Sequence, residues 1–385
     1  MNDPANAPAA SPPPPPKSHQ QQAPQQPPKA PSPPEIAEAL RKRVIGQTEA
    51  IEEMSIALSK KLAGLTTGNM LMIGSSGTGK TTLMRAVETF LSSRPELAVR
   101  STVVRMHANV LGEEAMRGHS GEAVLSRLLS RAREQLGGEA PLKRLLAQVK
   151  NGICFVDEVD KIRSHISGEP NTSGIRAQEA LLTLIENEVV PFTLPPWAGG
   201  KTITVDSSRI LFICGGAFEG LYDSVFDRVT VGRDRGALKP VTTVGEDGQV
   251  EERLIFHLAD WLRSEDLFDY GMSPQFLSRF DSKVLLSDLT VEELIRIFLE
   301  TPDSGYQQAR AYFASRGLHL ALSPEAVRRV AVEASYESRL GARALKEVFR
   351  RVIRRYEFDP RAAVNGPDGS VLLDRPEIEA ALQTG

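Results

Sequence analysis

Cysteine, aromatic residues and an excess of charge of either sign are all scarce in this sequence. Its 385 residues include two cysteines, which excludes both a disulfide framework and a four-cysteine zinc site. Cys154 and Cys214 each lie inside an apolar run, so we expect both to be small core residues. The 46 Lys and Arg residues and the 49 Asp and Glu residues give a net charge of -3. This balance argues against a polyphosphate backbone as the main partner, so we expect no nucleic acid.

Long apolar runs are also absent. No stretch approaches the roughly 18 apolar residues that a membrane span needs, and residues 1–4 do not begin a signal peptide. We therefore expect no membrane association and a cytoplasmic protein. Residues 1–34 contain no Leu, Ile, Val or aromatic residue, but they hold 13 of the 26 prolines. Because this composition cannot offset the entropy of ordering, we predict a disordered Pro/Gln-rich arm over residues 1–34.

Strand-like and helix-like patterns alternate after the arm. Apolar or β-branched runs of strand length occupy residues 69–74, 101–108, 152–159 and 207–216. A stretch with apolar residues at helical spacing follows the first of these runs. A second stretch of this kind lies between the last two runs. This alternation predicts an α/β fold over residues 35–284, with a parallel sheet covered by helices on both faces.

The pattern changes in the last hundred residues. Residues 288–293 indicate a helix start, and residues 318–322 indicate a strand. Ser323-Pro324-Glu325 is typical of a capped helix with proline at its first position. Residues 343–356 carry one apolar stripe at helical spacing. We predict a small, mostly helical C-terminal lid domain over residues 285–385.

The strongest motif is a glycine-rich loop. Gly74-Ser75-Ser76-Gly77-Thr78-Gly79-Lys80-Thr81 fits G-x-x-x-x-G-K-[ST] between an expected strand and an expected helix. Glycines let backbone N–H groups wrap the β-phosphate of a nucleotide, and the helix N-terminus adds positive potential. In such a loop Lys80 reaches the β- and γ-phosphates and Thr81 ligates Mg2+. A chance glycine-rich turn is the alternative, and the flanking strand and helix disfavour it.

Two acids follow the third expected strand. Ile153-Cys154-Phe155-Val156 is apolar and ends in Asp157 and Glu158. Such a strand delivers Asp157 to the carboxyl edge of the sheet beside Mg2+, and Glu158 can orient and deprotonate the attacking water. Alone, two acids after a strand are often the start of a solvated loop. Together with the phosphate loop they predict hydrolysis of a nucleoside triphosphate.

This order of motifs resembles the AAA+ ATPases and, within them, the ClpX unfoldase family. The resemblance extends from Pro34 to about Asp359. It rests on Val44-Ile45-Gly46-Gln47 and on residues 156–162, 210–218, 273–280 and 340–345. It implies ATP as the nucleotide, Mg2+ as the metal, a protein substrate and a homo-oligomer, as a rule a hexameric ring.

The resemblance also implies roles for single residues. Val44 and Ile45 match the segment beside the adenine. Arg279 matches the arginine finger, a guanidinium that one subunit supplies to the γ-phosphoryl oxygens in its neighbour. Arg343 matches the sensor 2 arginine, through which the lid domain detects the phosphate.

The predicted site residues fall into three groups. The nucleotide-binding residues are Val44, Ile45, Ser76, Gly77, Thr78, Gly79, Lys80, Thr81, Thr82 and Arg343. The catalytic residues are Glu158, Lys80, Asp157 and Arg279. The magnesium ligands are Thr81 and Asp157.

The chain also departs from the ClpX pattern. Members of this family normally begin with a cysteine-rich zinc domain, where this sequence has the proline-rich arm. The aromatic and aliphatic residues of the family's first pore loop are replaced in Gly118-His119-Ser120-Gly121. The apolar tripeptide that docks the family on the ClpP peptidase is missing from residues 228–252. The missing tripeptide makes association with ClpP doubtful, and the altered pore loop implies that polypeptide is gripped weakly or selectively.

The sequence as a whole favours a ring-forming ATPase that unfolds or remodels proteins. A divergent regulator that remodels one dedicated partner without threading it is the first alternative. A nucleic-acid motor is the second, and the net charge disfavours it. Stimulation of ATP hydrolysis by unfolded polypeptide, by one specific protein or by nucleic acid separates the three.

Overall fold

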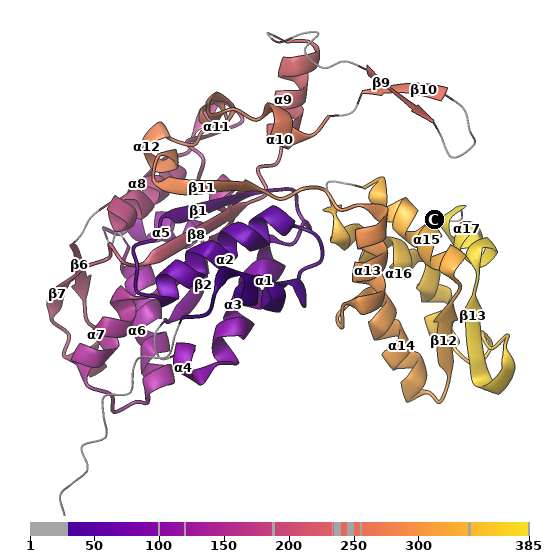
Figure 1. The fold of residues 1–385 in the computed structure, drawn as a ribbon, viewed down its shortest axis with the longest axis horizontal. Helices are drawn as coiled ribbons and strands as arrows, with labels where there is room; N and C mark the ends of the chain where they lie inside the picture. Colours follow the sequence, from indigo (N-terminus) through magenta and orange to yellow (C-terminus); the bar gives the residue numbers. More distant parts are fainter. Residues whose placement is uncertain are drawn as a thin grey trace, which may run out of the picture.

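The structure, a computed structural model, has a larger part built on a sheet and a smaller helical part (Figure 1). It describes residues 30–98, 101–118, 121–186, 189–232, 234, 240–244, 250–254, 256–337 and 340–383. Most of the predicted arm, up to Lys29, lies outside these residues. Within them, no helix combines the length and the apolarity that crossing a bilayer requires.

The central sheet has five strands in the order β11-β1-β8-β3-β2, and every neighbouring pair is parallel. The strands are β1 (Asn69–Ile73), β2 (Val103–His107), β3 (Ile153–Asp157), β8 (Leu211–Gly216) and β11 (Phe280–Leu285). Four of them confirm predicted strands. Strand β11 was not predicted, because three consecutive polar residues (Asp281–Lys283) interrupt this edge strand and only Phe280 and Val284 are buried.

Helices cover both faces of the sheet. One face packs against α1 (Pro33–Arg41), α2 (Thr48–Leu62), α3 (Lys80–Ser92) and α4 (Pro95–Ala98). The other packs against α5 (Asn109–Met116), α6 (Glu122–Leu136), α7 (Leu142–Lys150), α8 (Thr172–Glu186), α9 (Leu221–Thr230), α11 (Ser264–Asp269) and α12 (Pro274–Leu277). Cys154 and Cys214 are fully buried on this second face, and burial raises the pKa of Cys154 to about 12. The predicted α/β fold and the core role of both cysteines are confirmed.

Helix α1 begins before the expected end of the arm. Pro33 and Pro34 occupy its first positions, where a missing N–H leaves no helical hydrogen bond unmade. The backbone N and the side-chain hydroxyl of Ser32 each donate to Glu35 Oε2 at 2.7 Å. Ile36 is already fully buried. Helix α1 therefore begins within the last residues assigned to the arm, because proline is also typical of a helix start.

The larger part also contains shorter elements. They are β4 (His165–Ile166), β5 (Glu169–Pro170), β6 (Val190–Thr193), β7 (Thr202–Val205), β9 (Pro240–Val244), β10 (Val250–Leu254) and α10 (Leu258–Trp261). Strands β9 and β10 form an antiparallel ribbon that stands away from the sheet (Figure 1). His119 and Ser120 of the predicted pore loop, and residues 233, 235–239 and 245–249 of the segment that replaces the ClpP-docking loop, lie outside the described residues.

The smaller part has its own core. Its elements are α13 (Val291–Glu300), α14 (Gly305–Ser315), α15 (Pro324–Ser335), α16 (Ala342–Phe358), α17 (Arg375–Gln383) and the parallel pair β12 (His319–Leu322) and β13 (Ser370–Leu373). Ser323 caps α15 as predicted, since its Oγ accepts from Ala326 N at 3.1 Å. The buried members of this core run from Leu294 to Ala381, whereas the cores on the sheet end at Leu286. The mostly helical lid is confirmed, and these cores favour a boundary just after Leu286.

Candidate nucleotide site

The glycine-rich loop joins the end of β1 to the start of α3. Gly77 and Gly79 have φ angles of +77° and +111°, a backbone region that glycine adopts without strain. A Cβ on Gly77 would lie 2.1 Å from the carbonyl oxygen of Leu340, which belongs to the lid. Glycine at this position therefore permits both the turn and the close approach of the lid.

Lys80 opens α3, and its side chain lies inside the loop. Its Nζ donates to the carbonyl oxygens of Gly74 and Ser75, the latter at 2.8 Å. The side chain is almost completely buried, and burial lowers the pKa of Lys80 to about 8 in spite of the nearby Asp157. Because a neighbouring anion stabilises a buried ammonium, this lysine is well suited to bind a phosphate.

Thr81 and Asp157 meet at the carboxyl edge of the sheet. Thr81 Oγ1 donates to Asp157 Oδ2 at 3.3 Å, which joins the start of α3 to the end of β3. Asp160 borders the same cleft and is buried; its Oδ1 accepts from Ala217 N at 3.1 Å. Its Oδ2 has no hydrogen-bond donor among the described residues and lies 3.7 Å from Lys161 Nζ. Hydroxyl and carboxylate oxygens are the ligands that Mg2+ prefers, so this oxygen-rich corner fits the ion.

Glu158 follows Asp157 in an unusual backbone conformation. Its φ of +60° is left-handed, which is uncommon for any residue other than glycine and is often found at functional sites. Its carboxylate is about half exposed, and Oε2 lies 3.4 Å from Nδ1 of His107. His107 ends β2 and pairs in register with Asp157 on β3. His107 was not predicted as a site residue, because no motif marks the last residue of an ordinary strand.

The lid closes the other side of the loop. Arg343 NH1, in the first turn of α16, donates to Ser76 Oγ at 2.5 Å, and Ala342 N donates to the carbonyl oxygen of Gly77 at 3.2 Å. The cleft between the loop and the lid has a volume of about 570 Å³. The predicted residues that line it are Val44, Ile45, Ser76, Gly77, Thr78, Gly79, Lys80, Thr81, Thr82, Asp157, Glu158 and Arg343. A nucleotide-sized cleft thus joins the phosphate loop, the two acids and the lid.

The sequence is similar to known proteins. The family AAA domain (Cdc48 subfamily) matches residues 65–283. The ATP-dependent Clp protease ATP-binding subunit ClpX 3 of Methylococcus capsulatus is 31% identical over 356 residues, which cover 86% of this chain and 76% of that protein. The chain belongs to the ClpX family of AAA+ ATPases.

Two further relatives agree with this assignment. The ClpX subunit of Treponema denticola is 28% identical over 342 residues, covering 84% of this chain and 76% of that protein. The ClpX subunit of Porphyromonas gingivalis is 28% identical over 374 residues, covering 91% and 82%. The resemblance to ClpX is confirmed, and this ClpX-family chain is an ATPase.

Gln47 is a structural link that the sequence analysis names only as part of a matching segment. Its Nε2 donates to the carbonyl oxygens of Thr78, at 3.0 Å, and of Ser287, at 2.8 Å. Its Oε1 accepts from Ser287 N at 3.1 Å. Gln47 is buried and has a left-handed φ of +56°. One side chain therefore ties the phosphate loop to the segment that leads from the sheet to the lid.

Arg279 is placed elsewhere in this ClpX-family subunit. It is the residue before β11, at the edge of the sheet, and it does not line the nucleotide cleft. Its side chain is about half exposed and forms an ion pair with Glu186, the last residue of α8. The described part of the chain thus brings together every predicted site residue except Arg279.

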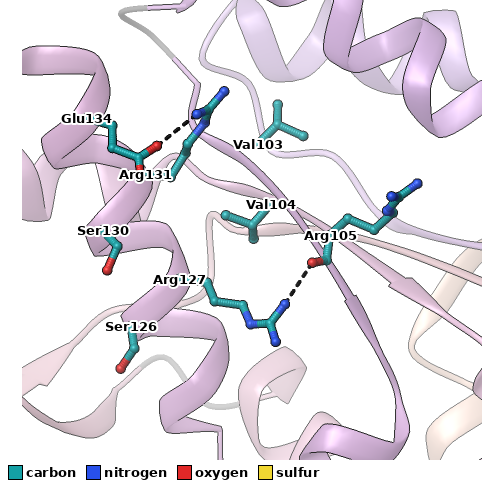
Figure 2. A pocket seen from close by; sticks show the side chains of 8 residues that line it. All are labelled: Val103, Val104, Arg105, Ser126, Arg127, Ser130, Arg131 and Glu134. Atoms are coloured by element: carbon teal, nitrogen blue, oxygen red, sulfur yellow. Dashed lines mark hydrogen bonds and ion pairs between the residues drawn. The ribbon is translucent and has the colours of Figure 1, made fainter.

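A second, more open cleft lies at the opposite edge of the sheet, between β2 and α6 (Figure 2). Arg127 NH1 donates to the carbonyl oxygen of Arg105 at 3.0 Å, and Arg131 pairs with Glu134 at 2.8 Å. Arg127 therefore covers part of an unpaired strand edge, a device that limits pairing with other chains. None of the predicted site residues lines this cleft.

Proposed function

We propose that this ClpX-family chain assembles into a hexameric ring and uses ATP hydrolysis to unfold or remodel proteins. The supporting observation is the separation of two arginines. Arg343 contacts the chain's own phosphate loop, whereas Arg279 lies outside the cleft at the sheet edge. A guanidinium stabilises a phosphoryl-transfer transition state only where it contacts the transferred group. Arg279 therefore needs the cleft of a second subunit, which couples hydrolysis to assembly.

The side chains of one cleft have distinct proposed roles. Lys80 binds the β- and γ-phosphates of ATP. Thr81 and Asp157 would hold Mg2+, which neutralises charge on the phosphate oxygens when bound. Glu158 orients the attacking water and accepts its proton.

The lid gives this hydrolysis a mechanical consequence. Arg343 contacts Ser76 of the phosphate loop, and Gln47 joins the same loop to Ser287. A change of charge at the γ-phosphate position therefore alters contacts on which the lid position depends. We propose this coupling as the route from hydrolysis to movement of a bound protein.

The substrate class is tested by stimulation of ATP hydrolysis. Steady-state turnover is measured alone and with an unfolded polypeptide, the same protein folded, single-stranded DNA, duplex DNA or RNA. We expect an increase with the unfolded polypeptide and none with nucleic acid. A Glu158→Gln variant controls for contaminating ATPases, because it should show no increase. Stimulation by nucleic acid alone would contradict the proposal.

A regulator dedicated to one protein partner is the second candidate, and the ClpP-docking segment favours it. Apolar side chains at a loop tip dominate docking interfaces of this kind, but the sequence here has Arg233, Asp234 and Arg235. Burying these charges in an apolar cleft is unfavourable. In the structure Asp234 pairs instead with Arg228 and, at 3.0 Å, with Arg263.

This candidate predicts no cooperation with ClpP. The protein is mixed with ClpP, ATP and a tagged reporter that requires unfolding, and loss of the reporter is followed with time. We expect the reporter to persist. ATP-dependent degradation of the reporter would contradict the second candidate and would show that the protein works with ClpP.

A further inference from the structure

The segment that carries Arg279 is anchored at its start by helix α8. Gln178, in the middle of α8, is buried. Its Nε2 donates to the carbonyl oxygens of Ile162, at 2.8 Å, and Gly271, at 3.0 Å. Its Oε1 accepts from Ser273 N at 2.8 Å. One amide therefore joins α8 both to the turn that follows the catalytic acids and to the beginning of the Arg279 segment.

Short-range contacts then fix the backbone up to Arg279. Ser273 Oγ caps α12 by accepting from Phe276 N at 3.3 Å. The backbone N of Arg279 donates to the carbonyl oxygen of Phe276 at 3.2 Å. Phe276 and Phe280 are buried, and their rings meet edge to face at 4.9 Å. The backbone on both sides of Arg279 is thus held by the core, while its side chain remains partly exposed.

The same helix contacts the tip of the side chain. Glu186 ends α8 and forms the ion pair with Arg279 NH2. Gln178 and Glu186 are eight residues apart on α8, so one helix contacts both the start of the segment and its functional group.

We propose that Glu186 is a positioning residue for the arginine finger. This inference rests on the proposed trans role of Arg279. A free arginine side chain has many rotamers, and a carboxylate at one edge of its planar guanidinium restricts them. A guanidinium has five N–H donors, so a pair at one edge leaves donors for the γ-phosphoryl group of a neighbour. Glu186 thereby lowers the entropy lost when the finger enters the adjacent site.

The ion pair is too exposed to contribute much to folding stability. The side chains of Arg279 and Glu186 are 47% and 31% exposed, and pairs of this kind contribute little to folding. Loss of Glu186 should therefore change turnover and leave thermal unfolding nearly unchanged. This difference separates a positioning role from a structural one.

Mixed rings provide the test, because Glu186 can be changed in either of two subunits. Arg279→Ala subunits keep the base, and Glu158→Gln subunits keep the finger. Their mixture should recover activity at interfaces that contain one intact base and one intact finger. Glu186→Ala placed in the Glu158→Gln subunit should lower this recovered turnover by about tenfold, with KM for ATP nearly unchanged. The same change in the Arg279→Ala subunit should have no effect, because that chain has no finger to position.

Two further variants control for charge and folding. Glu186→Gln retains an acceptor for the guanidinium, so we expect it to keep most of the recovered turnover. Glu179→Ala removes an exposed acid from the same helix, two turns earlier, and we expect no effect from either subunit. Equal loss from both placements of Glu186→Ala, no loss, or a gain would each overturn the proposal. No recovery in the parent mixture, in rings shown to be mixed, would remove the trans role of Arg279 and this proposal with it.

Discussion

The nucleotide cleft and the Arg279 segment differ in how much of their surroundings one chain supplies. In the cleft, the phosphate loop is contacted from the sheet by Asp157 and from the lid by Arg343. At the sheet edge, the Arg279 guanidinium has one ion-pair partner among the described residues, Glu186. One chain therefore supplies the residues that line the nucleotide cleft, whereas under the proposed trans role of Arg279 efficient hydrolysis needs a group from a second chain.

Arg279→Ala should have the largest effect on turnover. Arginine fingers contribute on the order of 10³-fold or more to phosphoryl transfer, so we expect kcat to fall by about 10³-fold while ATP affinity is retained. Steady-state hydrolysis and equilibrium binding of a fluorescent ATP analogue measure the two quantities. If the variant loses ATP binding in proportion to turnover, Arg279 acts in the cleft of its own chain, and the proposed trans role is wrong.

Glu158→Gln should have the next largest effect. The substitution removes the general base but keeps the size of the side chain, so we expect turnover to fall at least about 10²-fold with ATP still bound. Single-turnover hydrolysis in preformed rings measures the chemical step directly. Near wild-type turnover would remove Glu158 from its assigned role.

Lys80 should make ATP binding depend on pH. The pKa of Lys80 is lowered to about 8, so the ammonium is present below that pH and is lost as the pH rises through it. Bound phosphate favours the charged form and moves the loss to higher pH. We expect the Kd for ATP to rise by up to about tenfold per pH unit between pH 8, the approximate pKa of free Lys80, and the higher pKa of Lys80 in the complex.

Lys80→Met and Lys61→Met form a matched pair for this test. Lys61 is also buried, with a pKa lowered to about 7, but it does not line the cleft. Lys80→Met should weaken binding and abolish its pH dependence, whereas Lys61→Met should leave both unchanged. The same pH dependence in both variants would exclude Lys80 as its source.

Gln47→Ala should have the smallest of these effects on nucleotide binding. The substitution removes hydrogen bonds to Thr78 and Ser287, so a few-fold weaker ATP affinity is expected, together with about 1–3 kcal/mol lower stability. Isothermal titration and denaturant unfolding measure the two changes. Unchanged affinity would show that the link from the loop to the lid does not support the cleft.

Local sequence patterns were enough to predict the residues of the nucleotide cleft. A buried strand, a glycine-rich loop and a helix start are contiguous in the sequence, and so are β3 and its two acids. The edge strand β11 was missed because its alternation is weak, and β13 because four residues carry little periodic signal. The partners His107, Gln47 and Glu186 lie far from their contacts in the sequence, so only the fold reveals them.

If Arg279 of one subunit completes the site of another, two inactive variants should restore activity to each other when they are mixed. Arg279→Ala and Glu158→Gln subunits are combined at several ratios, mixed assembly is verified, and ATP hydrolysis is measured. We expect activity to return and to be highest near equal proportions, since interfaces with one intact base and one intact finger are then most frequent. No recovery in rings proven to contain both variants would contradict the trans role of Arg279.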